Sequence, residues 1–246
     1  MATLRAALFD LGGTLWEWYP NLTVEGILAG VTPQAIRLLS PEQAASLSPE
    51  EAAVAVRRAY LELEHAACDG DTSAMPVELS VQRGLASLGV TVDSQTAKDI
   101  TAALYVSERR TTRLLPRAAE ILHELALSGL RLGIISNRMY GGDLLLDDLG
   151  YFGISHYFFS IVTSAEAGQM KPHPALFKQA LAELSVDPSE AVMIGDDLCA
   201  DISGALAVGM RAVWVRRPAD RTDEPPAGVP SIRTLSELPS IIAAMH

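Results

Sequence analysis

The sequence of 246 residues contains only two cysteines, Cys68 and Cys199, which stand far apart in the chain. Two cysteines cannot build the disulfide framework of a small secreted domain, and they are typical of a reducing compartment. The chain also lacks any uncharged apolar run of about 18 residues, the length that would predict a transmembrane helix. Its first residues, MATLRAALFD, hold too short an apolar run for a secretory signal. We therefore expect a cytoplasmic protein with no membrane partner.

Basic residues are also in short supply. The chain has 19 Lys and Arg against 30 Asp and Glu, which gives a formal net charge of −11. A nucleic-acid binder needs a basic face that displaces counterions from phosphates, so the balance argues against nucleic acid as a partner. It does not exclude a small anionic substrate, because a bound metal changes the local sign of the charge.

Short apolar runs alternate with helical patterns over most of the chain. The runs that predict strands are 4–9, 130–135, 158–162, 191–194 and 211–215. The helical patterns between them are 117–128, 141–149, 174–184 and 200–208. Strands that alternate with helices imply parallel βαβ units and a sheet covered on both faces. We expect a Rossmann-like α/β core over residues 1–16 and 114–246.

The stretch 17–113 has no convincing strand pattern and reads as helical. The sequence SPEE from Ser48 predicts a helix start, and apolar residues then recur at helical spacing at Ala53, Val56, Tyr60 and Leu63. A second helix is predicted over 77–88, and Ser94 is expected to cap a third. The sequence therefore predicts an α-helical domain, 17–113, inserted between the first strand and the rest of the core.

Polar side chains follow the predicted strands. They are Asp10 in DLGGT, the pair Ser136 and Asn137, and Asp196, Asp197 and Asp201 in GDDLCAD; Lys171 lies in the loop before the helix at 174–184. Ligands of open α/β sheets bind at the carboxyl ends of the strands, so these residues are expected to meet at one edge.

The residue types at this edge suit one chemistry. An aspartate can act as a nucleophile, clustered carboxylates can hold Mg²⁺, and a lysine can stabilise a transferring phosphoryl group. Each residue taken alone is more often a turn, cap or loop residue. On the same grounds, we expect His173 to be a helix-entry residue and Cys199 a small packed side chain.

In their order, these four motifs resemble those of the haloacid dehalogenase superfamily of hydrolases. Residues 10–14 match the first motif except at one position, Ser136 matches the second, Lys171 the third, and the acidic loop after Gly195 the fourth. The likeness covers residues 4–17 and 113–217. It implies that 17–113 is a helical cap domain that closes over the site and selects the substrate.

The resemblance also implies a role for each residue. Asp10 would be the nucleophile and Lys171 its catalytic partner. Phosphate oxygens would be held by Thr14, Ser136, Asn137 and Lys171. A Mg²⁺ ion would be bound by Asp10, the backbone carbonyl of Gly12 and Asp196, with help from Asp197 or Asp201. The substrate would be a small phosphorylated metabolite.

One acid is missing from this pattern. Phosphatases of the superfamily carry a second aspartate two residues after the nucleophile, where it transfers protons as a general acid and base; here that position is Gly12. Three interpretations follow. The chain is a phosphatase in which another acid, such as Glu17, or water replaces the aspartate. It is a 2-haloacid dehalogenase or a phosphonate hydrolase. The paired acids at 196–197 argue against a dehalogenase, and the lack of a cap lysine other than Lys98 argues against a phosphonate hydrolase. Or it is a weakly active relative that binds a phosphorylated ligand or a protein. The sequence favours the phosphatase and indicates no oligomeric state.

Overall fold

The computed structural model describes residues 2–18, 37–48, 51–52, 55, 67–73, 77–108, 112–138, 140–217 and 223–245. The chain divides into two compact units. One consists of Met1–Glu17 and Leu114–His246, and the other consists of Trp18–Arg113. We call them the core unit and the helical unit, and each is described by itself.

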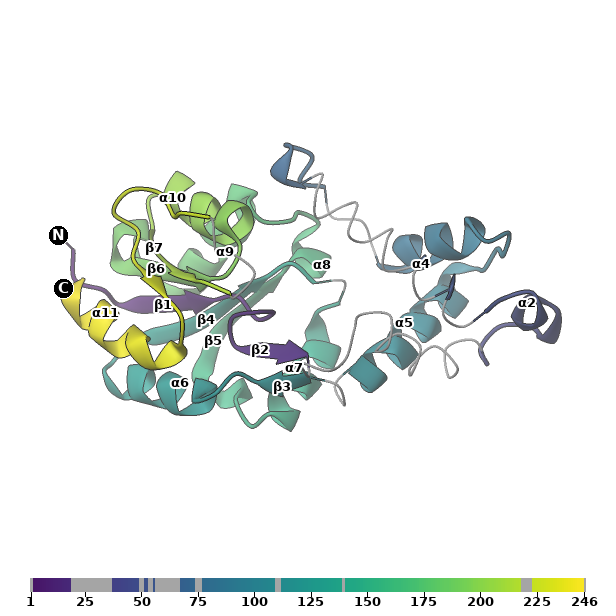
Figure 1. Cartoon of the computed structure of the whole chain (residues 1–246), viewed down its shortest axis with the longest axis horizontal. Helices are drawn as coiled ribbons and strands as arrows, with labels where there is room; N and C mark the ends of the chain where they lie inside the picture. Colours follow the sequence, from purple (N-terminus) through teal and green to yellow (C-terminus); the bar gives the residue numbers. More distant parts are fainter. Residues whose placement is uncertain are drawn as a thin grey trace. The chain divides into compact units, whose positions relative to one another are not determined.

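The core unit is built on one six-stranded sheet in the order β5-β4-β1-β6-β7-β8 (Figure 1). Its strands are β1 (Ala6–Phe9), β4 (Arg131–Ser136), β5 (Phe158–Thr163), β6 (Ala191–Gly195), β7 (Arg211–Val215) and β8 (Ser231–Ile232). Every neighbouring pair is parallel. The predicted α/β fold is therefore confirmed. The strand order reverses between β1 and β6, which is the place where doubly wound sheets bind their ligands.

Strand β1 lies at the centre of the sheet and is buried along its whole length. Phe9 pairs with Ile134 of β4 on one side and with Ile194 of β6 on the other, so the three strands reach the same edge in register. Because side chains alternate along a strand, Ala6 and Leu8 pack on one face of the sheet while Phe9 points to the other. Burial on both faces explains why the sequence shows a continuous apolar run here.

Helices cover both faces of the sheet (Figure 1). They are α6 (Ala118–Leu127), α7 (Gly142–Tyr151), α8 (Ser164–Ala167), α9 (Pro174–Leu184), α10 (Gly204–Ala207) and α11 (Leu238–Ala244). Figure 1 shows α9 and α10 on one face and α6 and α11 on the other. Short 3₁₀ helices are η2 (Ser155–Tyr157), η3 (Pro188–Glu190) and η5 (Leu235–Glu237).

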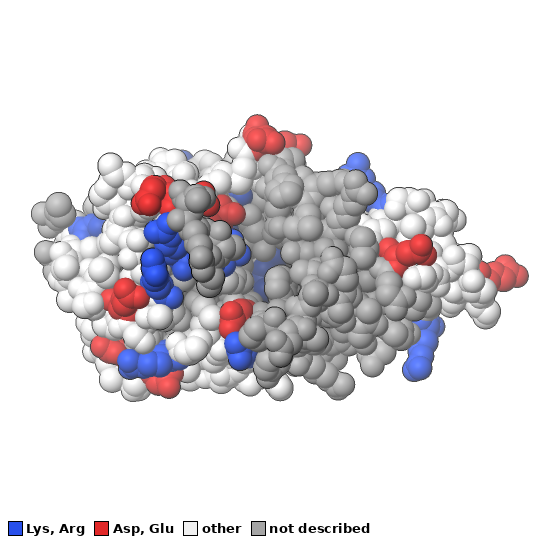
Figure 2. Space-filling model, in the orientation of Figure 1, with Lys and Arg blue, Asp and Glu red and all other residues white. Residues whose placement is uncertain are grey.

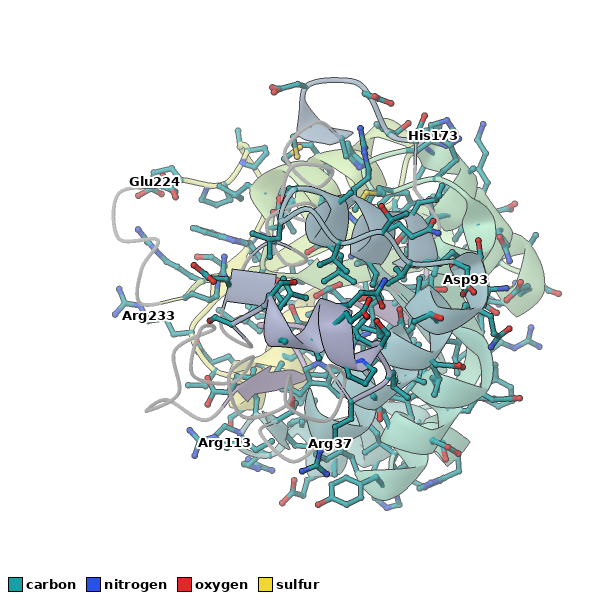
Figure 3. The ribbon with its side chains drawn as sticks, turned by 90° about the vertical axis from the view of Figure 1, so that its right-hand side faces the viewer. Arg37, Asp93, Arg113, His173, Glu224 and Arg233 are labelled. Carbon is teal, nitrogen blue, oxygen red and sulfur yellow. The ribbon has the colours of Figure 1, made fainter. Side chains whose placement is uncertain are left out.

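Helix α9 has the predicted bounds because its ends are encoded locally. The His173 side chain accepts a hydrogen bond from the Ala175 N–H at 3.2 Å, and Pro174 occupies the first turn, where its missing N–H costs nothing. His173, labelled in Figure 3, is thus a helix-capping residue, as expected. The helix ends at Ser185, which adopts a left-handed conformation.

The predicted helix over 200–208 takes a different form. A π-helical segment, η4 (Leu198–Ser203), precedes the single turn of α10. Asp197 caps η4, since its carboxylate accepts hydrogen bonds from the N–H groups of Cys199 and Ala200, both at 2.8 Å. The helical segment therefore begins two residues earlier than the sequence predicts.

Helices of the helical unit that the structure describes are α2 (Pro41–Ala45), α4 (Val77–Ala86) and α5 (Ser94–Glu108). Val81 and Leu85 of α4 and Ala97 and Ile100 of α5 are buried, which supplies an apolar core. The third predicted helix is capped by Asp93 rather than by Ser94, because the Asp93 carboxylate accepts the Thr96 N–H at 2.7 Å (Figure 3). The expected helical positions 53, 56, 60 and 63 lie outside the described residues.

Two short strands at the unit boundary were not predicted. Strands β2 (Trp16–Trp18) and β3 (Thr112–Leu114) form a two-stranded sheet. Three residues are too few to show an alternating pattern, so the sequence gives no signal for them.

Helix length and surface charge are the features that bear on a membrane or nucleic-acid partner. Among the described residues, no helix is both long enough and apolar enough to cross a membrane. In the part of the surface that is coloured in Figure 2, acidic and basic side chains lie next to one another rather than in separate fields.

Candidate functional site

The predicted site residues converge on the carboxyl edge of the sheet. Asp10 directly follows β1, Ser136 is the last residue of β4, and Asp196 directly follows β6. The Asp10 N–H donates to the Ile194 carbonyl at 2.9 Å, which extends the hydrogen-bond ladder between β1 and β6 by one residue. These residues therefore lie on adjacent strands at the point where the strand order reverses.

Lys171 reaches this edge from the loop between α8 and α9. Its side chain is 2% exposed, and its ammonium donates to Asp10 Oδ1 at 2.7 Å, to the Ile135 carbonyl at 2.8 Å and to Asp201 Oδ1 at 2.5 Å. These three bonds use all three N–H donors of the ammonium. Burial by itself would lower the pKa of Lys171, but the two carboxylates outweigh it and raise the pKa above its ordinary value.

The two oxygens of the Asp10 carboxylate have different surroundings. Oδ1 accepts hydrogen bonds from Lys171 and from the Ser136 hydroxyl, the latter at 3.0 Å. Oδ2 accepts none from the described residues. One oxygen is thus fixed and neutralised, while the other keeps its lone pairs for an electrophile or a metal ion.

Three buried carboxylates gather at this point. Asp10, Asp196 and Asp201 can each offer an oxygen within 4.8 Å of the others. Burial, followed by repulsion from Asp10 and Asp201, raises the pKa of Asp196 to about 8, although Arg217 and Lys171 oppose the shift. Burial also raises the pKa of Asp201 to about 7, against the attraction of Lys171.

This cluster fits a hard divalent cation. Three carboxylates share this point with the cations of Lys171 and Arg217, and carboxylate oxygens are the ligands that Mg²⁺ prefers. Asp10 has a free oxygen for such an ion, whereas Asp201 is more fully engaged, with Oδ1 on Lys171 and Oδ2 accepting the Asp197 N–H at 3.0 Å.

Asp197 lies outside the three-carboxylate cluster. Its side chain is exposed and caps η4, as described above. Gly12 lies in the loop after β1, and its role as a metal ligand through the backbone carbonyl stays a prediction. The structure therefore brings three of the five expected metal-binding residues, Asp10, Asp196 and Asp201, together through their side chains.

The residues expected to bind phosphate contact other residues of the site. The Thr14 hydroxyl donates to Asp196 Oδ1 at 3.4 Å, and the Ser136 hydroxyl donates to Asp10. The Asn137 side chain accepts the Lys171 N–H at 2.7 Å and donates to the Lys171 carbonyl at 3.1 Å. This reciprocal pair fixes the backbone of Lys171, a role that the sequence did not predict.

Two glycines allow the acidic side chains to approach the backbone closely. A Cβ on Gly13 would lie 2.3 Å from Asp196 Oδ2, and Gly13 has a φ of +73°, which L side chains rarely adopt. A Cβ on Gly195 would lie 2.3 Å from Asp201 Cγ. By contrast, a Cβ on Gly12 would meet no atom within 4 Å. Gly13 and Gly195 are sterically required, and Gly12 is not.

Two residues that hold Asp196 were not predicted from the sequence. Trp214 of β7 donates its indole N–H to the Asp196 carbonyl at 2.9 Å. Arg217, two residues past β7, places its Nε 2.9 Å from Asp196 Oδ2. The one available signal was their position, since β7 neighbours β6 and Arg217 follows its carboxyl end.

Comparisons with known proteins agree with the four-motif resemblance. Residues 52–215, well over half of the chain, match the family described as haloacid dehalogenase-like hydrolase. A phosphoserine phosphatase of Thermus thermophilus is 39% identical over 132 residues, which cover 54% of this chain and 51% of the relative. The chain spans about half the length of the curated relatives it matches.

Two solved structures resemble the fold over nearly its full length. A phosphatase from Thermococcus onnurineus covers 97% of this chain and 98% of its own, with a TM-score of 0.67 and 26% identity. A 2-haloacid dehalogenase from Pseudomonas syringae covers 99% and 100%, with a TM-score of 0.68 and 26% identity. With the sheet order, the clustered motif residues and the match over 52–215 together, this chain belongs to the haloacid dehalogenase-like hydrolase family.

Proposed function

We propose that this chain is a Mg²⁺-dependent phosphatase that acts on a small phosphorylated metabolite with Asp10 as nucleophile. The observation that carries the proposal is the asymmetry of the Asp10 carboxylate, whose Oδ1 is held by Lys171 and Ser136 while Oδ2 faces no donor of the described residues. Relatives named as phosphatases of phosphoserine and glyceraldehyde 3-phosphate support the substrate class.

The metal ion would be held by Asp10 and Asp196, with the Gly12 carbonyl and Asp197 or Asp201 in support. A bound Mg²⁺ would offset the repulsion between an anionic nucleophile and an anionic phosphate. Its presence would also favour the ionised forms of Asp196 and Asp201, whose pKa values are raised first by burial and then by repulsion from neighbouring carboxylates.

The protein's own residues account for the bond changes. Asp10 Oδ2 attacks phosphorus, the bond from phosphorus to the ester oxygen breaks, and an aspartyl-phosphate forms. The leaving oxygen takes the electron pair of that bond and a proton from water or from another acid such as Glu17, because Gly12 has no acidic side chain. A water molecule then attacks phosphorus and loses a proton to solvent, and the bond from phosphorus to Asp10 Oδ2 breaks, which releases inorganic phosphate and restores the Asp10 carboxylate. Lys171 keeps its charge throughout, so it stabilises the carboxylate and the neighbouring phosphoryl oxygens rather than transferring a proton.

Substrate positioning is assigned to the residues around the nucleophile. We place Thr14, Ser136, Asn137 and Lys171 at the phosphoryl group, and Asn137 also sets the position of the lysine through its backbone pair. The choice among substrates is assigned to the helical unit, as the resemblance implies. The relatives differ in the substrates they are named for, so no single metabolite is proposed.

A second candidate is 2-haloacid dehalogenase chemistry. It is favoured by Gly12, because a halide leaves with its electron pair and needs no proton from a general acid. The TM-score and the sequence identity to a 2-haloacid dehalogenase structure are about the same as those to a phosphatase structure. In this reaction Asp10 would displace the halide from carbon and form an ester, which water would hydrolyse. The third carboxylate at Asp196 supports the phosphatase instead, since a metal-free displacement has no use for it.

A substrate panel separates these candidates. Phosphate esters and 2-haloacids are incubated with the full chain, with Mg²⁺ and with a chelator, and phosphate and halide are measured. Phosphate release that the chelator abolishes supports the phosphatase, and halide release that the chelator leaves unchanged supports the dehalogenase. If neither phosphate nor halide is released from any substrate, a binding role is supported.

Asp10→Asn tests the nucleophile. The substitution preserves shape but removes the attacking charge, so turnover should fall to background. Asp147→Asn, an exposed position on α7, is the matched control and should retain wild-type turnover. Activity that survives in Asp10→Asn would contradict the assignment of the nucleophile.

A further inference from the structure

Asp196 has a charged partner that none of the four motifs contains. Arg217 Nε lies 2.9 Å from Asp196 Oδ2, although the arginine side chain is 51% exposed and the aspartate side chain only 8%. A buried carboxylate is thus paired with a cation that comes in from the solvent side.

The two site cations are divided among the three carboxylates. Lys171 donates to Asp10 and Asp201, and its third N–H goes to a backbone carbonyl, so none remains for Asp196. Within the described part of the chain, Arg217 is therefore the one cation in direct contact with Asp196.

The geometry restricts the ways in which the Asp196 carboxylate can turn. Oδ1 accepts the Thr14 hydroxyl at 3.4 Å, and Oδ2 lies against Gly13, where even a Cβ would come within 2.3 Å. A cation that binds Asp196 must therefore approach a carboxylate whose second oxygen already carries the guanidinium.

We propose that Arg217 is the resident counter-ion of Asp196 and that it competes with a divalent cation for this carboxylate, thereby setting the cation affinity of the site. The inference rests on the proposed function, in which Asp196 is a metal ligand. Two cations that share one carboxylate repel each other. The ion pair between Arg217 and Asp196 is therefore weaker when a divalent ion already neutralises the carboxylate. The arginine would stabilise the metal-free protein and weaken metal binding.

The chain offers a matched control in Arg216. Its guanidinium lies over the Trp214 ring at 5.4 Å and reaches Glu224 at 3.9 Å. Glu224 is highly exposed and stands at the rim of the molecule in Figure 3. Arg216→Gln removes the same charge as Arg217→Gln from the neighbouring position, without removing the partner of Asp196.

The experiment measures binding of Mg²⁺ and Mn²⁺ to the full chain by titration calorimetry at low salt and fixed pH. Arg217→Gln should bind Mg²⁺ and Mn²⁺ roughly threefold to tenfold more tightly than Arg216→Gln does. The expected gain in affinity is this small because solvent screens a half-exposed cation. Arg217→Lys keeps the charge and should stay near the wild type. Urea unfolding in chelator gives a second readout: Arg217→Gln should be the less stable of the two glutamine variants, and saturating Mg²⁺ should close the gap.

Each result has a definite meaning. Equal affinities in the two glutamine variants would overturn the inference and leave the proposed function intact. Weaker binding by Arg217→Gln would also overturn it, because the arginine would then orient Asp196 for the ion. If the wild type and every variant bind no divalent cation, the metal site of the proposed function fails as well.

Discussion

Gly12→Asp restores the one acid that the family pattern contains and this chain lacks. A Cβ at Gly12 would meet no atom within 4 Å, and the glycine does not adopt the left-handed conformation that would strain another residue. A Cβ at this exposed position therefore has room.

The size of the effect should depend on the leaving group. General acid–base catalysis contributes about 10²–10⁴-fold where the leaving oxygen must be protonated, as in an alkyl phosphate such as phosphoserine. An aryl phosphate such as p-nitrophenyl phosphate releases a stabilised phenolate, so its gain should be no more than roughly tenfold. The wild type should accordingly prefer aryl over alkyl esters by a wider margin than Gly12→Asp does.

The assay is phosphate release from both esters at saturating Mg²⁺, reported as kcat and kcat/KM. Gly12→Asn has almost the same shape but no transferable acidic proton, so it should show no gain. Gly12→Ala checks that a side chain at this position is tolerated. Equal gains in turnover for Gly12→Asn and Gly12→Asp, or equal gains for the two esters in Gly12→Asp, would contradict a general-acid role for the new side chain.

Three further predictions follow from the site. Lys171→Met leaves two buried carboxylates unpaired and should lower the free energy of unfolding by about 3–5 kcal/mol in chelator, measured by urea denaturation; unchanged stability would show that the ion pairs are not stabilising. Gly195→Ala drives a methyl group into Asp201 and should cost about 1–3 kcal/mol, whereas Gly12→Ala, which meets no atom, should cost little by the same measurement. The raised pKa of Asp196 means that the folded state holds this proton up to about pH 8 while the unfolded state loses it near pH 4, so stability in chelator should fall as pH rises across that interval. Added Mg²⁺ needs the ionised carboxylate and should restore most stability at the upper end, and a flat profile would contradict the assignment.

Local sequence signals were sufficient for most of the core unit. Helix α9 and strand β7 have the bounds that the sequence predicts, because a capping His173 with Pro174 and a continuous buried apolar run are encoded within a few residues. Strands β2 and β3 were missed because they are short and depend on a partner from a distant part of the chain. The helix after β6 departs from prediction because Asp197 caps it early.

The candidate site divides in the same way. Asp10, Ser136 and Asp196 each stand at or next to a strand end, which predicts that they meet, since parallel strands end at a common edge. Lys171 lies in the loop before α9, and its place in the site was predicted from the order of the four motifs. The sequence also shows the missing acid at Gly12 directly. It does not show that Asn137 fixes the Lys171 backbone, because that pair depends on the position of two loops 34 residues apart.

Strand and turn signals are local, so the residue types at the strand ends and their order can be read from the amino-acid sequence alone. The division of charge among these residues, by contrast, follows from the tertiary fold. Lys171 is shared by Asp10 and Asp201, Asp197 caps a helix, and Asp196 is left to Arg217. That division depends on burial and on distances of a few ångströms between residues far apart in the chain, and no local pattern encodes either.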